Sequence, residues 1–308
     1  MPSTTVTLPD NTDTASSPSK HSAFAQRATD YIEFIKPRLV VMILITTAAG
    51  FYLGAQQTVD WLLCLHTLIG SGLTAAGVLG LNQYLERDVD AQMKRTQERP
   101  LPGGRMNPLE ALIVGAVLTA SGMLYLVFIV NMLSGFVISL IVVSYLFLYT
   151  PLKRKTSLCT LIGAVPGALP PVVGWVAARG TLTGEAWVLF AILFLWQLPH
   201  SLAIAYIYCE DYANAGFRLL PVVHPDGAST CRQIVINCVA LLGIGLLPAL
   251  YNLAGNIYFF TALLAGVGFL AFGIHLERTR SIKAARYLLY ASLLYLPLVF
   301  ITMALDKI

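Results

Sequence analysis

Residues 61–85, "WLLCLHTLIGSGLTAAGVLGLNQYL", contain no Asp, Glu, Lys or Arg. A helix that crosses a membrane needs roughly 20 consecutive apolar residues, so this stretch is long enough to span one. Similar charge-free stretches recur along the chain, at 39–59, 111–152, 156–178, 186–209, 233–276 and 287–305. Two of them are about twice as long as one span, and each has a natural break, at Asn131 and at 252–256. The sequence therefore predicts nine membrane-spanning helices.

The composition supports this fold class. Of the 308 residues, 56% are hydrophobic and only 12% are charged, whereas a soluble domain is about a quarter charged. The alternating pattern of a transmembrane strand is absent, so helices must satisfy the backbone hydrogen bonds inside the bilayer. We expect an all-α membrane protein, a bundle of nine transmembrane helices. The expected spans are 34–55, 61–87, 109–130, 133–151, 157–178, 185–209, 231–252, 256–276 and 285–305.

The basic residues predict the orientation. Of the 20 Lys and Arg residues, 18 lie in the N-terminal tail or in the loops that follow the even-numbered helices. Because basic loops stay on the cytoplasmic side, we expect a cytoplasmic N-terminus and a C-terminus on the opposite side. The net charge of +4 then reflects topology and does not indicate nucleic acid. Residues 1–30 are expected to form a disordered cytoplasmic tail without the features of a transit peptide, which favours a bacterial plasma (inner) membrane. Residues 31–308 are expected to form one membrane domain.

The most unusual segment is 82–105, which carries nine charged residues, five of them basic. Asn82, Glu86 and Asp90 are spaced by four, so they share one face of a helix leaving the membrane. Carboxylates placed in this way repel each other, and a hard divalent cation such as Mg²⁺ would offset the repulsion. The alternative interpretation is a solvated loop with surface ion pairs.

Several basic residues lie close to this face in the sequence. Arg95 and Arg99 are again four residues apart, and Lys153 and Arg154 end the fourth span. Guanidinium groups bind phosphate oxygens in a bidentate manner, so a diphosphate is one ligand that would fit. The alternative is that these residues are only topology signals.

A second polar cluster lies between 196 and 223. His200 follows Pro199 inside an apolar run, and an ionisable group within the membrane is a candidate functional residue. The alternative is a neutral histidine bonded to a helix carbonyl that Pro199 leaves free. Glu210 and Asp211 could supply a further metal ligand, but adjacent residues point to different faces, so at most one of them would join the site.

Four motifs carry a resemblance to a known family. The pattern N-x3-E-x3-D-x4-RT-x2-RPL at 82–101 resembles the first aspartate-rich motif of the UbiA-type membrane prenyltransferases. The blocks "YTPLKRKT" (149–156), "GALPPVVGW" (167–175) and "FLWQLPHSLAIA…EDY…LLPVV" (194–223) are similar to one branch, the protohaem IX farnesyltransferases or haem O synthases. The resemblance runs from about Phe34 to the last helix.

This resemblance implies helices arranged around a central cavity, capped by cytoplasmic loops. It implies an Mg²⁺-dependent enzyme that transfers the farnesyl group of farnesyl diphosphate to a vinyl group of haem b, with addition of water. The product would be haem O, made in haem biosynthesis for terminal oxidases. The resemblance assigns one metal to Asn82, Glu86 and Asp90, a second metal to Asp211, and the diphosphate to Arg95, Arg99, Lys153 and Arg154. His200 is the candidate for water activation or contact with haem.

The chain departs from the family pattern at two positions. Glu86 stands where an aspartate is usual, and Ile207 replaces the first aspartate of the second motif, four residues before Asp211.

The expected surroundings are membrane lipid, with a haem-supplying or oxidase-assembly protein as the expected partner. Two other functions are compatible with part of the pattern. One is prenylation of an aromatic quinone precursor, and the other is secondary transport, although transporter sites usually lie near the bilayer midplane.

Overall fold

The computed structural model describes residues 20–308, so residues 1–19 of the expected tail lie outside the described residues. Within the described part, nine helical segments are long and apolar enough to cross a membrane, which confirms the expected number. The first five are α2 (Pro37–Gly54), α3 (Trp61–Asp90), α4 with the π-helical η1 (Pro108–Tyr125, Leu126–Val130), α5 with η2 and α6 (Met132–Val143, Ser144–Tyr149, Thr150–Leu152), and α7 with α8 (Cys159–Ala168, Pro170–Arg179). The others are α9 (Gly184–Ile207), α12 with α13 (Ala228–Gly245, Leu247–Leu250), α14 (Asn256–Thr279) and α15 (Ile282–Leu305).

The start of the chain corrects one expectation. Residues 20–30 were expected to be disordered and the first span to begin near 34, but α1 (Lys20–Ile35) is a separate helix that precedes the first span. Side-chain contacts that the sequence does not show hold α1 in place. Arg105 donates to Asp30 at 2.7 Å and to Glu33 at 2.5 Å, so a distant loop residue fixes this helix against the bundle.

Both breaks expected inside the long charge-free stretches are present. Asn131 adopts an extended backbone between η1 and α5, and its side chain accepts a hydrogen bond from the Ser134 amide at 2.8 Å. Asparagine is among the residues that favour this capping position, because its side-chain oxygen satisfies an otherwise free amide. The second break separates α13 from α14. The two chain reversals therefore follow from local sequence.

The bundle core forms where helices with small residues approach each other closely. α2 packs against α8, and a β-carbon placed on Gly174 would lie 1.9 Å from the Thr47 carbonyl oxygen. The reverse contact is equally tight, since a β-carbon on Gly50 would lie 2.0 Å from the Pro171 carbonyl oxygen. Small residues allow such backbone contact in membrane bundles. The closely spaced Gly and Pro residues of α8 therefore serve its packing against α2.

We expect Gly174→Ala to lower the melting temperature of the purified protein. The added methyl group has no room, and overpacking of this kind costs about 1–3 kcal/mol. Gly268→Ala is the matched control, because nothing lies within 4 Å of that position in α14. There the higher helix propensity of alanine should leave stability unchanged or raise it by up to about 1 kcal/mol. Equal melting temperatures for the two variants would contradict the close α2–α8 contact.

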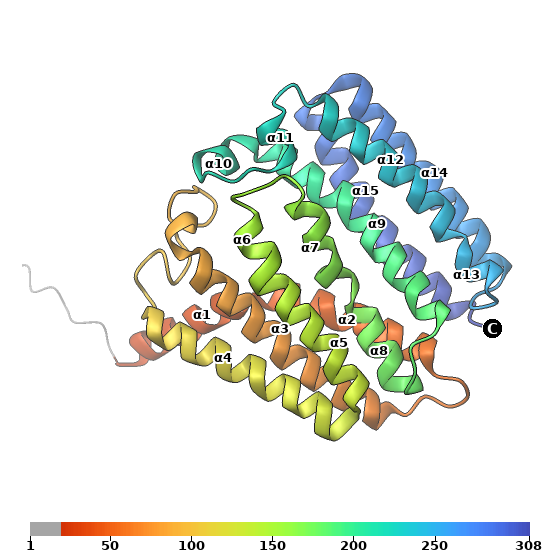
Figure 1. Ribbon diagram of the computed structural model, residues 1–308, viewed down its shortest axis with the longest axis horizontal. Coiled ribbons are helices and arrows are strands. Elements are labelled where there is room, and N and C mark those ends of the chain that lie inside the picture. The colour runs from red at the N-terminus through yellow and green to blue at the C-terminus, as the bar shows by residue number, and fades with distance from the viewer. Residues whose placement is uncertain (1–19) are drawn as a thin grey trace, which may run out of the picture.

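The two ends of the bundle differ in composition. At one end lie α1, the loop 91–107, the loop 153–158 and the short helices α10 (Cys209–Asn214) and α11 (Leu220–Val223); we call this the polar end (Figure 1). The C-terminus lies at the opposite end (Figure 1). There Lys307 donates to the carbonyl oxygens of Tyr52 and Ala55 at 2.7 and 2.5 Å. The last residues thus tie the end of α15 to the end of α2.

Candidate active site

The last turns of α3 carry a buried polar face at the polar end. Asn82, Glu86 and Asp90 are 3%, 7% and 1% exposed, although a helix end beside loops would ordinarily be solvated. Asp88, which the spacing places on another face, has an 83% exposed side chain. Because a buried charge is costly unless it is paired, the contacts of Glu86 and Asp90 determine what this face can do.

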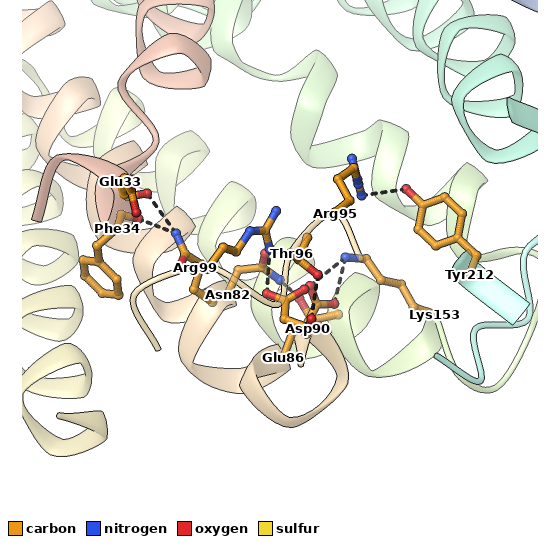
Figure 2. Close-up of polar contacts among 12 residues, drawn as sticks. Glu33, Phe34, Asn82, Glu86, Asp90, Arg95, Thr96, Arg99, Lys153 and Tyr212 are labelled. Atoms are coloured by element: carbon orange, nitrogen blue, oxygen red, sulfur yellow. Dashed lines mark hydrogen bonds and ion pairs between the residues drawn. The ribbon is translucent and has the colours of Figure 1, made fainter. Parts of the chain in front are cut away.

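Glu86 is paired with Lys153. The Lys153 ammonium donates to both carboxylate oxygens, at 2.8 and 3.1 Å, and it lies 4.5 Å from the centre of the Tyr149 ring. Burial on its own would lower the pKa of Lys153, but Tyr149 and Glu86 outweigh it and raise that pKa above its ordinary value. Lys153 therefore remains a cation, next to the end of α3 (Figure 2).

Asp90 is paired with Arg99. Their N–O distance is 2.6 Å, and Arg99 reaches Asp90 because the loop after α3 turns back on itself. The Thr96 hydroxyl fixes this turn by donating to the Asp90 carbonyl oxygen at 2.8 Å. Figure 2 shows Arg99 and Lys153 approaching the α3 face from two different segments.

Asn82 completes the oxygen-bearing face. Its amide nitrogen donates to the Thr150 hydroxyl at 3.3 Å, and that hydroxyl donates to the Tyr145 carbonyl oxygen at 2.9 Å. The side-chain oxygen of Asn82 is therefore available as a ligand. Two carboxylates and one amide oxygen form a hard donor set, which suits Mg²⁺ completed by substrate phosphates. The described residues contain no group of three or more His, Cys, Asp or Glu side chains that could hold a metal by themselves.

Three other predicted residues lie at the polar end with different surroundings. Arg95 reaches across to α10, where it donates to the Tyr212 hydroxyl at 3.1 Å and lies over the Tyr208 ring at 5.4 Å. Asp211 is half-buried in the first turn of α10, next to Tyr212. Arg154 is exposed. The structure thus joins Arg95 to α10 and does not bring Asp211 or Arg154 into the ion pairs on α3.

His200 lies away from these ion pairs, between α9 and α15. Its Nδ1 atom is 2.7 Å from the Ser292 hydroxyl, and its ring stacks on Trp196 at 4.9 Å. The Ser292 hydroxyl donates its single proton to the Leu289 carbonyl oxygen at 2.6 Å. The serine must therefore accept from His200, whose Nδ1 carries the proton and whose Nε2 keeps a lone pair. The alternative of a bond to a carbonyl left free by Pro199 is not what the structure shows.

A small apolar cavity lies inside the bundle. Its volume is about 80 Å³, and residues of α2, α3, α5, η2, α7 and α8 line it. Val78 and Leu79 of its wall lie one turn from Asn82 along α3, and Tyr145 is also part of the wall. The cavity therefore lies next to the polar face of α3.

The sequence did not identify several residues that hold this site together. Thr150 contacts Asn82, and Tyr212 contacts Arg95. Arg105 and Gln83 both contact α1, Gln83 at its end. Thr150 and Tyr212 each had a signal, since they lie within the blocks "YTPLKRKT" and "EDY". The contacts of all four residues join segments far apart in the sequence, which spacing does not reveal.

The class of protein follows from the fold and from comparison with known families. Residues 43–303 match the model of the UbiA prenyltransferase family. The chain belongs to this family of membrane prenyltransferases. Within it, the chain is 48% identical to a protoheme IX farnesyltransferase of Solibacter usitatus over 90% of this chain and 98% of the relative. It is 45% identical to a protoheme IX farnesyltransferase of Koribacter versatilis over 90% and 93%.

Solved structures agree on the fold. A digeranylgeranylglyceryl phosphate synthase has a TM-score of 0.78 at 16% identity, covering 91% of this chain and 98% of that chain. A UbiA homologue from Archaeoglobus fulgidus, bound to DMAPP and Mg²⁺, has a TM-score of 0.64 at 15% identity, covering 89% and 99%. At such low identities the likeness concerns the arrangement of helices. It confirms the expected all-helical membrane fold.

Proposed function

We propose that this prenyltransferase transfers the farnesyl group of farnesyl diphosphate to a vinyl group of haem b, with addition of water, to give haem O. The names of the relatives support the acceptor and the donor. One structural observation carries the chemistry. Two buried carboxylates on one face of α3 are each paired with a cation from another segment, so ligands for a metal and cations for a diphosphate already lie together.

The oxygen-bearing face fits one Mg²⁺ ion. Asn82, Glu86 and Asp90 would hold it, and Mg²⁺, when bound, neutralises diphosphate oxygens and stabilises the leaving group. The magnesium that accompanies DMAPP in the Archaeoglobus fulgidus homologue supports this choice of metal. Asp211 offers a single carboxylate of α10 at the same polar end, so a second ion there would depend mainly on the substrate.

The cations of the site would bind the diphosphate itself. Arg99 and Lys153 now neutralise Asp90 and Glu86, and the same groups can donate to phosphate oxygens. Arg95 adds charge from the α10 side, and Arg154 is the outermost candidate. Fixed positive charge stabilises the negative charge that develops on the departing diphosphate, which is the largest effect such a site offers.

The rest of the reaction requires control of water. The apolar wall near Val78 and Leu79 would shield the farnesyl cation, while the vinyl carbon of haem b attacks it. Water then adds to the resulting porphyrin-side cation and releases a proton, so diphosphate and one proton leave for each haem O formed. His200, whose Nε2 lone pair is free, is our candidate for contact with haem or for activating that water.

We further propose that the polar end faces the cytoplasm of a bacterium and that the protein lies in the plasma (inner) membrane. The 18 basic residues of the tail and the even-to-odd loops support this orientation. Haem b is poorly soluble in water, so a haem-supplying or oxidase-assembly protein is the partner we would expect.

The test is a reaction of the purified protein with haem b, farnesyl diphosphate and Mg²⁺, analysed by mass spectrometry. A product heavier than haem b by one farnesyl group and one hydroxyl group supports the proposal, provided that it disappears when EDTA is added. Transfer to an aromatic acid instead of haem b would replace the acceptor. Transfer that persists in EDTA would remove the metal from the mechanism.

A further inference from the structure

Lys36 occupies an unusual position between α1 and α2. Its backbone is left-handed, with φ 52° and ψ 63°, and its carbonyl accepts from the amides of Leu39 and Val40 at 3.0 and 3.2 Å. Residues other than glycine adopt this conformation rarely. Such strain persists only where surrounding structure imposes it, and it is common at functional sites. The conformation itself therefore calls for an explanation.

The surrounding structure that imposes this turn comes from α3. The Gln83 side-chain amide donates to the carbonyl oxygens of Glu33 and Phe34, at 3.1 and 2.9 Å. The Phe34 ring is fully buried against Gly80, where an added β-carbon would lie 2.4 Å from the ring. The helix that carries Asn82, Glu86 and Asp90 thus also fixes the turn that holds Lys36.

The charges around Lys36 are those of the candidate active site. Burial lowers the pKa of Lys36 most, the charges of Arg99 and Lys153 lower it as well, and Asp90 and Glu86 raise it; the net pKa is about 7. Arg99 and Lys153 each have a carboxylate partner, whereas Lys36 forms no ion pair within residues 25–308 whose side chains are described. Next to the paired Arg99 and Lys153, Lys36 is therefore a cation whose charge no carboxylate among these described residues offsets.

We propose that Lys36 also binds the diphosphate of the prenyl substrate, as a further cationic contact contributed by the α1–α2 turn. The assignment rests on the proposed function for the identity of the anion. Its ammonium would donate to a phosphate oxygen on the side of the site opposite Arg95 and α10. Arg38, two residues further on, is also a basic residue before the first span, but it is exposed and does not share the surroundings of Lys36.

Arg38 therefore provides a matched control. Binding of farnesyl diphosphate with Mg²⁺ and without haem would be measured by calorimetry on the full chain in detergent. Lys36→Met should weaken binding about ten- to hundredfold, the usual effect of losing one charge-assisted contact. Lys36→Arg should stay within about threefold of the native protein, since it keeps the charge, and Arg38→Met should bind like the native protein.

The melting temperature of each variant separates lost binding from lost folding. If Lys36→Met unfolds, Lys36→Gln, which keeps a donor without the charge, is measured in its place. Native affinity in both neutral variants, or an equal loss in Arg38→Met, would overturn the assignment. A native protein that binds farnesyl diphosphate but does not modify haem b would refute only the acceptor. A native protein that binds no farnesyl diphosphate would refute both proposals.

Discussion

Asp90→Asn is expected to lower the rate of haem farnesylation by about a thousandfold or more. The substitution removes one carboxylate from the proposed metal ligands and leaves Arg99 without its anionic partner. Removing a single group that stabilises charge in a transition state typically costs about 10²–10³-fold, and weaker metal binding adds to that loss. The measurement is the initial rate of product formation at saturating farnesyl diphosphate, over a series of Mg²⁺ concentrations.

Asp88→Asn is the control for this prediction, because Asp88 has an 83% exposed side chain and only a 3.7 Å ion pair with Arg87. Exposed pairs of this kind contribute about 0–1 kcal/mol, so this variant should retain native activity. Partial rescue of Asp90→Asn at high Mg²⁺ would support a ligand role. Equal activity of the two variants would show that the buried face of α3 is not the reaction site.

Exchanging the charges of Glu86 and Lys153 should separate folding from catalysis. Each single change, Glu86→Lys or Lys153→Glu, places two like charges together where the side chains are only 9% and 15% exposed. An uncompensated buried charge costs about 3–5 kcal/mol, so both single variants should melt at clearly lower temperatures. The double variant restores an opposite-charge pair and should recover most of that loss.

Activity should not recover with stability in the double variant. Position 86 would then carry an ammonium instead of a metal-binding carboxylate, so we expect farnesylation about a thousandfold or more below the native rate. The paired readouts are the melting temperature and the rate of product formation on the same samples. A double variant that is both stable and active would mean that this ion pair only holds α3 and α6 together.

The site itself was only partly predictable from sequence. The spacing of Asn82, Glu86 and Asp90 was enough to place them on one helix face, because three to four residues make one turn. Their burial and their partners were not predictable. Lys153 lies 67 residues from Glu86, and its presence there depends on how the fourth span packs. In the sequence, Lys36 is one of several basic residues before the first span, and its left-handed turn arises from contacts with α3 that the sequence does not show.

By itself, the sequence determined the membrane-spanning class of the protein, the nine spans that residues 20–308 contain, and the one polar end. Hydrophobic length and loop charge decide this directly, since a span needs only enough apolar residues and basic loops resist translocation. Only the tertiary structure decided that α1 is a docked helix, that His200 faces α15, and that Arg99 and Lys153 meet the carboxylates of α3. These contacts join distant segments, and side-chain pairing follows the packing of the helices, which hydrophobic patterning leaves open.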